Sequence, residues 1–205
     1  MASGRYTLPN EEARSPIYGN ENIQKELTNA AFRVHYSIVY PDLATLRKLY
    51  SSYINTALNE KNETVIILPF FETTDNVRRI LEQSEFDIDV TKHERQGSLI
   101  IIDSLKGYFD PPGVMSLINQ GLEHARTLEK NGLTALGDMG SFFHTHKEDN
   151  SLIEHELSLP SEFDQETNLK SFCLYNKQEF DKRLSEEQKE KLLKHHGKNM
   201  IITTS

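Results

Sequence analysis

Two carboxylates lie where short apolar runs of the sequence end, and such positions suit ligand binding. Asp103 closes the run Ser98–Asp103, and Asp138 lies near the end of the run Leu133–Met139. In open α/β sheets, ligands bind beyond the carboxyl ends of the strands, so both side chains are expected to face one crevice. The alternative is that each carboxylate caps a loop or the next helix, and the sequence leaves both interpretations open.

A metal site is suggested by two imidazoles at positions i and i+2, His144 and His146, with Glu148, His155 and Glu156 nearby in the sequence. Two such imidazoles can share a metal from a strand or a loop. No HExxH motif or Cys/His quartet accompanies them. The favoured interpretation is therefore surface histidines in an acidic segment, with no metal and no cofactor.

The single thiol of the chain, Cys173, cannot form an internal disulfide. Cys173 and Tyr175 alternate within a strand-like run and are expected to point to the same face. A buried cysteine is usually a small apolar filler, and a reactive thiol is the alternative. His195-His196 is expected at a helix end, where cationic groups suit the dipole, with ligand contact as the alternative.

The turn after the first strand-like run tests the idea of a nucleotide site. A phosphate-binding loop needs glycines, which let backbone N–H groups approach the phosphates, and a lysine followed by Ser or Thr. Here the run Phe32–Tyr40 continues into Pro41-Asp42, without a glycine or a lysine. The patterns GxxxxGK, GxGxxG and GxSxG are absent from the whole sequence. Conventional NTPase and α/β-hydrolase chemistry is therefore not expected, and no catalytic residue is assigned.

The elements that must position these residues alternate between strand-like and helical patterns. Nearly all-apolar runs are typical of buried strands in a parallel sheet, and they occur at Phe32–Tyr40, Thr64–Phe70, Ser98–Asp103, Leu133–Met139, Leu169–Tyr175 and Asn199–Thr203. Helical spacing of apolar residues predicts helices over Leu43–Asn59 with Asp42 as N-cap, from Thr74 or Asp75 to about Gln83, over Gly113–Lys130, and from Ser185 to His196-Gly197. The acidic stretch Glu148–Glu166 is expected to be a surface helix and loop. The predicted fold is α/β: a three-layer, mainly parallel sheet with helices on both faces.

Composition limits the class of protein. The 205 residues are 37% hydrophobic and 26% charged, which is enough to bury the core of one domain. A formal net charge of −8 argues against direct nucleic-acid binding. The polar N-terminus has no signal-peptide core, and no run approaches the roughly 18 apolar residues of a membrane helix. Residues 1–30 are expected to form a polar, partly flexible arm, residues 31–205 a single domain, and the location is expected to be cytoplasmic.

Several short segments, in order, resemble the MEDS family, the methanogen/methylotroph sensory domains. The resemblance spans roughly residues 32–203. Its first half rests on His35–Tyr40 and on Gly97–Asp103 with Tyr108-Phe109 after it. Its second half rests on Gly137-Asp138-Met139 and on Cys173-Leu174-Tyr175, followed by Phe180, His195 or His196, and Met200-Ile201-Ile202. The chain departs from the family pattern at Ala135, where an arginine is expected, and near Phe142, where a tryptophan is common. The missing arginine argues against an anionic ligand.

The resemblance implies a RecA-like domain without a working phosphate loop, and a sensory role. Family members are thought to detect small organic compounds. The expected partners are a small organic ligand and a signalling protein, with a homo-oligomer as a further possibility.

The resulting hypothesis is a non-catalytic small-molecule sensing module with a degenerate nucleotide-type site. Its ligand-binding residues are predicted to be His35, Tyr40, Asp103, Tyr108, Asp138, Cys173 and Tyr175. Two alternatives stay open: a cryptic enzyme, either an atypical NTPase or a metal-dependent hydrolase using His144 and His146, and an interaction subunit held in an oligomer.

Overall fold

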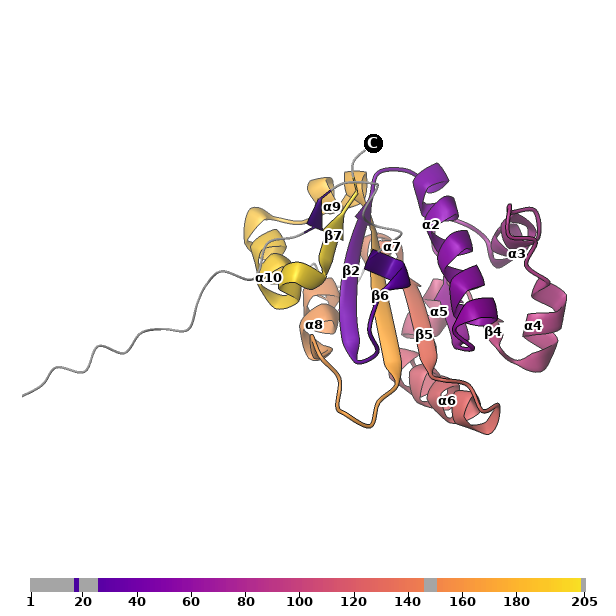
Figure 1. Ribbon diagram of the computed structural model, residues 1–205. Coiled ribbons are helices and arrows are strands. Elements are labelled where there is room, and N and C mark those ends of the chain that lie inside the picture. The colour runs from indigo at the N-terminus through magenta and orange to yellow at the C-terminus, as the bar shows by residue number, and fades with distance from the viewer. Residues whose placement is uncertain (1–16, 19–25, 146–150, 204–205) are drawn as a thin grey trace, which may run out of the picture.

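A computed structural model describes residues 17–18, 26–145 and 151–203 (Figure 1). A seven-stranded sheet in the order β1-β7-β2-β6-β5-β3-β4 forms its centre. The named strands pair in parallel throughout. They are β1 (Ile17–Tyr18), β2 (Val34–Tyr40), β3 (Thr64–Leu68), β4 (Leu99–Ile101), β5 (Leu133–Asp138), β6 (Leu169–Asn176) and β7 (Met200–Ile202). The predicted strands after residue 30 are confirmed.

Helices cover both faces of the sheet, which confirms the predicted three-layer α/β fold (Figure 1). One face carries α2 (Leu43–Asn55), α3 (Thr74–Glu82) and α4 (Val90–Gln96). The opposite face is covered by α6 (Val114–Thr127), α8 (Ser151–Ser158), α9 (Lys177–Arg183) and α10 (Glu186–His196). The short helices α5 (Ser104–Phe109) and α7 (Gly140–His144) follow β4 and β5 directly.

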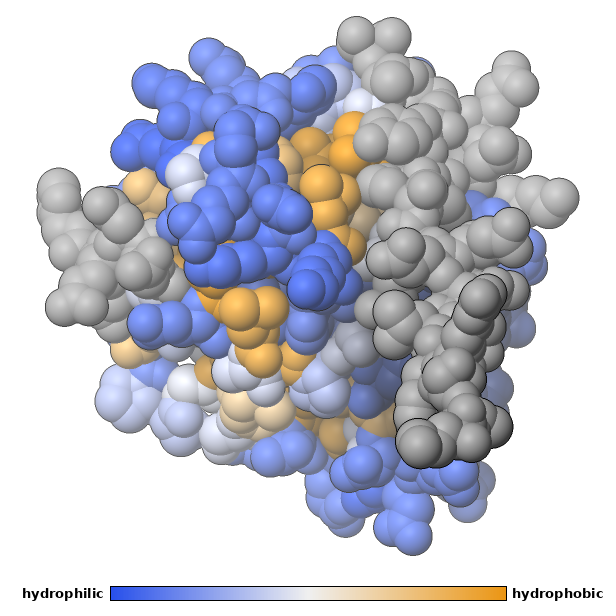
Figure 2. Space-filling model, turned by 90° about the vertical axis from the view of Figure 1, so that its left-hand side faces the viewer, coloured by the Kyte–Doolittle hydropathy of each residue, from blue (hydrophilic) through white to orange (hydrophobic). Residues whose placement is uncertain are grey.

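Side chains alternate across the sheet, so each strand contributes to two cores. On β2, Ile38 packs with the residues of α2, α3 and α4, while its neighbour Val39 packs with those of α8, α9 and α10. The side of the molecule formed by α8 to α10 has a mostly hydrophilic surface, with apolar side chains visible between the hydrophilic ones (Figure 2). Two separate interiors therefore lie on either side of one sheet.

Capping residues begin the helices largely where the sequence predicts. Asp42 accepts a hydrogen bond from the N–H of Thr45 at 2.8 Å and begins α2. A capping box between Ser185 and Gln188 begins α10. The cap of α3 was predicted at Thr74 or Asp75 and is instead Thr73, whose side chain accepts a hydrogen bond from the N–H of Asn76; the helix itself begins at Thr74. A π-helical turn, Thr56–Glu60, extends α2.

The first 30 residues are described only at 17–18 and 26–30. Ile17 and Tyr18 pair with Ile201 and Ile202 of β7 and extend the sheet by one short strand. Leu27 and Ala30 are buried in the core beneath α2. The division at residue 30 between an arm and a domain stays a prediction. Within the described ranges, no helix has both the length and the apolar character needed to cross a bilayer.

Candidate functional site

The alternation of side chains divides the predicted site residues between the two faces of the sheet. His35 of β2 and Cys173 and Tyr175 of β6 face the helices α8, α9 and α10. Tyr40 and Asp138 project from the opposite side, toward α2 and the β3–α3 loop. The structure therefore does not bring the seven predicted residues to one crevice.

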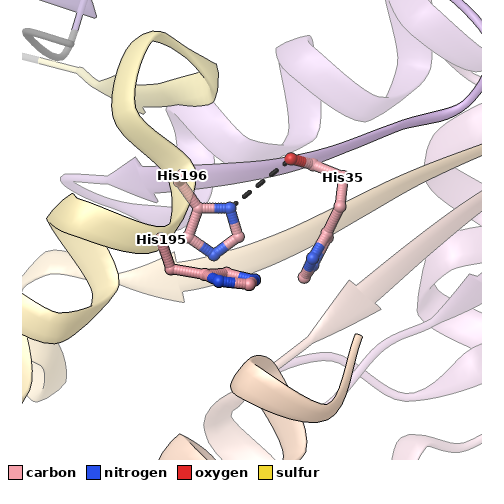
Figure 3. A group of neighbouring side chains, drawn as sticks. All are labelled: His35, His195 and His196. Carbon is pink, nitrogen blue, oxygen red and sulfur yellow. Dashed lines mark hydrogen bonds between the residues drawn. The ribbon is translucent and has the colours of Figure 1, made fainter. Parts of the chain in front are cut away.

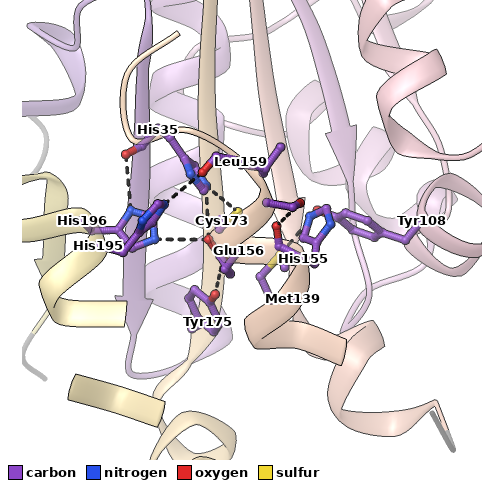
Figure 4. Close-up of polar contacts among 11 residues, drawn as sticks. His35, Tyr108, Met139, His155, Glu156, Leu159, Cys173, Tyr175, His195 and His196 are labelled. Carbon is purple, nitrogen blue, oxygen red and sulfur yellow. Dashed lines mark hydrogen bonds and ion pairs between the residues drawn. The ribbon is translucent and has the colours of Figure 1, made fainter. Parts of the chain in front are cut away.

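One buried polar network, which we call the Glu156 cluster, consists of His35, Glu156, Cys173, Tyr175 and His196 (Figure 4). Nε2 of His35 lies 3.3 Å, and Nε2 of His196 3.2 Å, from the same carboxylate oxygen, Oε2 of Glu156. The hydroxyl of Tyr175 donates a hydrogen bond to the other oxygen. Sγ of Cys173 lies 3.1 Å from Nε2 of His35. Four elements, β2, β6, α8 and α10, thus meet at one carboxylate.

Burial and hydrogen bonding set opposite protonation preferences within this cluster. Burial alone would raise the pKa of Glu156, but the hydrogen bond with His196 and the charges of His35 and His196 outweigh it and lower the pKa to about 2. Burial lowers the pKa of His35 to about 4 despite the attraction of Glu156. Near neutral pH the carboxylate is therefore ionised beside a neutral imidazole. Burial also raises the pKa of the Cys173 thiol, which favours the predicted packing role over a reactive thiolate.

Two adjacent histidines at the end of α10 point into this region (Figure 3). The ring centroid of His35 lies 4.6 Å from that of His196 and 6.2 Å from that of His195. Nε2 of His195 lies 3.0 Å from the carbonyl oxygen of Leu159. The expected role of this pair as a helix-end cap does not describe His196, because its ring is buried against Glu156.

An aromatic group adjoins the cluster on the same face. The Tyr108 ring lies 5.0 Å from that of Phe142 and 5.3 Å from that of His155, measured between centroids. Its hydroxyl lies 3.5 Å from Sδ of Met139. The ring reaches this position because Gly137 has no side chain: a Cβ there would lie 1.9 Å from the Tyr108 hydroxyl oxygen.

Beside this aromatic group lies a pocket with a mainly apolar lining. Its walls come from β3, β5, β6, α5, α6 and α8 and include Leu68, Tyr108, Val114, Met115, Ile118, Ala135, His155, Phe163 and Cys173. Polar atoms are few and come chiefly from Tyr108, His155, Ser171 and Cys173. Ala135, where the family resemblance led us to expect an arginine, is one of the wall residues, so no cation is supplied from that position. The arrangement suits a small uncharged molecule.

The opposite face holds a second buried carboxylate, Asp138. Its oxygens accept hydrogen bonds from the backbone N–H groups of Phe70 at 3.4 Å, Phe71 at 3.3 Å and Gly140 at 2.9 Å. Burial raises the pKa of Asp138 to about 6, and these hydrogen bonds only partly offset it. The hydroxyl of Tyr40 is buried there without a hydrogen-bond partner among the described residues.

Neighbouring charges on this face are already paired. Arg47 contacts Oε1 of Glu72 through Nε at 2.7 Å and Nη2 at 2.6 Å. The hydroxyl of Tyr50 donates to Oε2 of Glu72 at 3.0 Å. Asp42 occupies the first N–H groups of α2, which follow the Tyr40-Pro41-Asp42 turn. The helix N-terminus at this turn is therefore capped by the chain itself.

The remaining predicted residues lie apart from both carboxylates. Asp103 accepts from the N–H groups of Leu105 at 3.0 Å and Lys106 at 3.3 Å and so caps α5, the alternative that the sequence left open. It follows β4, which β3 separates from β5 and Asp138. His144 is exposed, stacks on Phe70 and lies 3.5 Å from Glu179. His146 lies outside the described residues, so a metal shared with His144 stays untested.

In the sequence, Glu156 and His155 were noted only as neighbours of His144 and His146 and were not among the predicted ligand-binding residues. The stretch around them was predicted to be a surface helix and loop, yet Glu156 is fully buried. A signal was present: Leu152 and Ile153 precede Glu156 by four and three residues, which places it on the apolar face of α8. A carboxylate on such a face needs polar partners from neighbouring elements.

Comparison with known proteins identifies the family and the fold. A family model described as "MEDS: MEthanogen/methylotroph, DcmR Sensory domain" matches residues 34–196. Among solved structures, the crystal structure of the KaiC-like protein PH0186 from the hyperthermophilic archaeon Pyrococcus horikoshii OT3 is similar in fold, with a TM-score of 0.50 and 16% identity. The similarity covers 70% of this chain and 61% of that protein. No curated protein matches the sequence.

Proposed function

This chain belongs to the MEDS family of sensory domains, and from that premise we propose that it senses a small uncharged organic molecule without catalysing a reaction. The observation that carries the proposal is the apolar pocket between β5, β6, α5, α6 and α8. A few polar groups among apolar walls are what a binding site for a small organic compound requires. Tyr108, His155 and Cys173 supply such groups, so the predicted residues Tyr108 and Cys173 stay in the proposed site.

The same geometry argues against a nucleotide. The Tyr40-Pro41-Asp42 turn contains no glycine, and the carboxylate of Asp42 fills the helix N-terminus where a phosphate would bind. Asp138, which faces this edge, has its oxygens directed to three backbone N–H groups. We therefore treat this edge as a degenerate nucleotide-type site and assign the ligand to the other face.

Ligand binding would be coupled to a signalling output through the aromatic group of Tyr108, Phe142 and His155. Tyr108 contacts both the pocket and Met139, and Met139 packs with the side chains of α8 and α9. A ligand that displaces Tyr108 would shift these contacts and change the surface of α8. Recognition of that surface by a signalling protein, or by a second copy, is part of the proposal.

The test is a thermal-shift and calorimetric screen of the full chain with short-chain alcohols, aldehydes and haloalkanes, with ATP in parallel. We expect saturable binding of at least one organic compound and none of ATP. Gly137→Ala should weaken that binding at least tenfold, because the new Cβ would displace the Tyr108 hydroxyl. Tyr108→Phe keeps the ring but removes the hydroxyl, so it measures how much of the binding depends on that polar group. Binding of ATP without any organic ligand, or unchanged affinity in Gly137→Ala, would overturn the proposal.

A further inference from the structure

Five side chains that commonly ligate transition metals converge where α10 meets β2, β6 and α8. One ring nitrogen from each of His35, His195 and His196 lies within 4.8 Å of the others (Figure 3). Ligand atoms of His35, Glu156 and Cys173 also lie within 4.8 Å of one another. Imidazole, carboxylate and thiol are the ligands of zinc and related metals.

In their neutral forms, the buried rings of His196 and His35 are incompletely satisfied by hydrogen bonding within the protein. Nδ1 of His196 lies 3.4 Å from the carbonyl oxygen of His35, and its Nε2 lies 3.2 Å from the carboxylate of Glu156. Both neighbours are acceptors, yet a neutral imidazole carries a single N–H. If Nδ1–H donates to the carbonyl, the lone pair of Nε2 faces a carboxylate oxygen. A metal cation between Nε2 of His196 and Oε2 of Glu156 would be bound by both atoms, which would replace the repulsion between them.

His35 shows a related shortage. Its Nε2 approaches both Glu156 and Cys173, while its buried Nδ1 has no hydrogen-bond partner among the described residues. A ring that is fully buried is normally hydrogen-bonded at both nitrogens. The close polar neighbours of His35 therefore all gather on the side that faces Glu156.

We propose that His35, His195, His196 and Glu156 bind one first-row divalent transition metal ion, such as Zn²⁺. Around a tetrahedral Zn²⁺ with bonds of about 2.0–2.1 Å, ligand atoms lie about 3.3 Å apart. Oε2 of Glu156 lies 3.3 Å from Nε2 of His35 and 3.2 Å from Nε2 of His196. Both pairs that include the Glu156 oxygen thus have the spacing of ligands before a metal is added.

Supporting contacts have the form expected around a metal site. The carbonyl of His35 faces Nδ1 of His196, and the carbonyl of Leu159 lies 3.0 Å from Nε2 of His195. Donation of Nε2–H to that carbonyl leaves Nδ1 of His195 for the metal. The hydroxyl of Tyr175 donates to the second oxygen of Glu156. Such contacts fix the tautomer and orientation of ligands.

An access path exists on the surface. A depression lined by Ser161, Glu162 and the segment 195–199 opens at His195 and His196. His195 is half-buried, whereas His35, Glu156 and His196 are buried. An ion can therefore reach the site from solvent through His195, and no step of this proposal depends on the sensing function.

The experiment measures the affinity of the chelator-treated full chain for Zn²⁺ and Co²⁺, by competition with a chromophoric chelator and by elemental analysis after dialysis. No organic ligand is added, so the outcome is separate from that of the sensing screen. We expect one equivalent of metal. His195→Ala should weaken binding at least tenfold, because removal of even a supporting contact costs about 10–100-fold. His195 is used because it is the least buried of the four ligands; circular dichroism checks that the variant folds.

His144→Ala is the matched control. His144 is an exposed histidine that lies outside the cluster, and its neighbour is Glu179 rather than Glu156. This variant should bind metal as the unmodified chain does. Absence of stoichiometric binding by the full chain would overturn the proposal and leave the cluster as a hydrogen-bonded network. Loss of metal in His144→Ala together with retention in His195→Ala would overturn it as well, and would place the metal near residues 144–146.

Discussion

Two of the buried carboxylates, Glu156 and Asp138, lie against opposite faces of one sheet and are held by different kinds of partner. Glu156 contacts side chains from three other elements, those of His35, Tyr175 and His196. Asp138 contacts backbone N–H groups of its own and the neighbouring loop. The side-chain partners lower the pKa of Glu156 to about 2, whereas burial raises that of Asp138 to about 6.

This difference indicates which face can change its state. The backbone contacts of Asp138 tie two strand ends together and leave little room for an added molecule. The partners of Glu156 are imidazoles and a phenol, which can exchange a hydrogen bond for a metal ion or move with a neighbouring ligand. The apolar pocket also lies on the Glu156 side, with Cys173 common to both. This contrast is consistent with the proposed sensing site on the Glu156 side of the sheet.

The largest expected effect is that of Glu156→Ala on stability. Removing the carboxylate leaves His35, Tyr175 and His196 buried without their common acceptor, and breaking such a network costs about 3–5 kcal/mol. The free energy of unfolding, from urea denaturation with a chelator present, checks this. Glu154→Ala, an exposed residue of the same helix, should change stability by less than about 0.5 kcal/mol.

Glu72→Ala provides the comparison on the other face. Glu72 is buried, but its partner Arg47 is 40% exposed and can be hydrated once the carboxylate is gone. The expected cost is about 1–2 kcal/mol. Equal losses for Glu72→Ala and Glu156→Ala would contradict the distinction between the two faces.

The sequence predicted the sheet well because buried parallel strands are short apolar runs, and six of these runs are strands in the structure. It also predicted Asp42 as a cap and the common face of Cys173 and Tyr175. These features depend on local spacing alone. Short helices such as α5 and α7 carry too few residues for a helical period, so neither was predicted.

The site was harder to predict because it depends on which strands are neighbours. Strand ends at the same edge of a sheet can project to opposite faces, and Tyr40 and Tyr175 do so although β2 and β6 are paired. Glu156 contacts His35, which is more than a hundred positions away in the chain. No local pattern encodes a contact of that range.

The next largest effect concerns pH and Asp138. The carboxyl has a pKa of 3.8 in the unfolded chain and about 6 in the folded protein, so ionisation penalises the folded state. The penalty is absent below pH 3.8, grows between these two values, and reaches about 3 kcal/mol above pH 6. Asp138→Asn stays neutral throughout. Its stability relative to the unmodified protein should therefore rise by about 2 kcal/mol between pH 4.5 and pH 8.

Urea denaturation at a series of pH values gives this difference directly. Any hydrogen bond that the amide does not accept is lost equally at every pH, so the slope isolates the ionisation. A difference that is constant between pH 4.5 and pH 8, or one that falls, would show that the backbone N–H groups stabilise the anion more than burial penalises it. The two carboxylates would then behave alike, and the comparison would fail.

The smallest structural change removes one hydroxyl on each face. Tyr175→Phe deletes the donor to Glu156, a hydrogen bond to an ionised group worth about 1.5–3 kcal/mol. Tyr40→Phe deletes a buried hydroxyl that has no partner among the described residues, so the folded protein should be unchanged or stabilised by up to about 1 kcal/mol. Both rings are fully buried, and the substitution is the same. Opposite signs in the free energy of unfolding would therefore reflect the hydrogen-bonding state of each face. A loss in Tyr40→Phe as large as that in Tyr175→Phe would show that Tyr40 donates to Asp138, and that the second face is also a closed side-chain network.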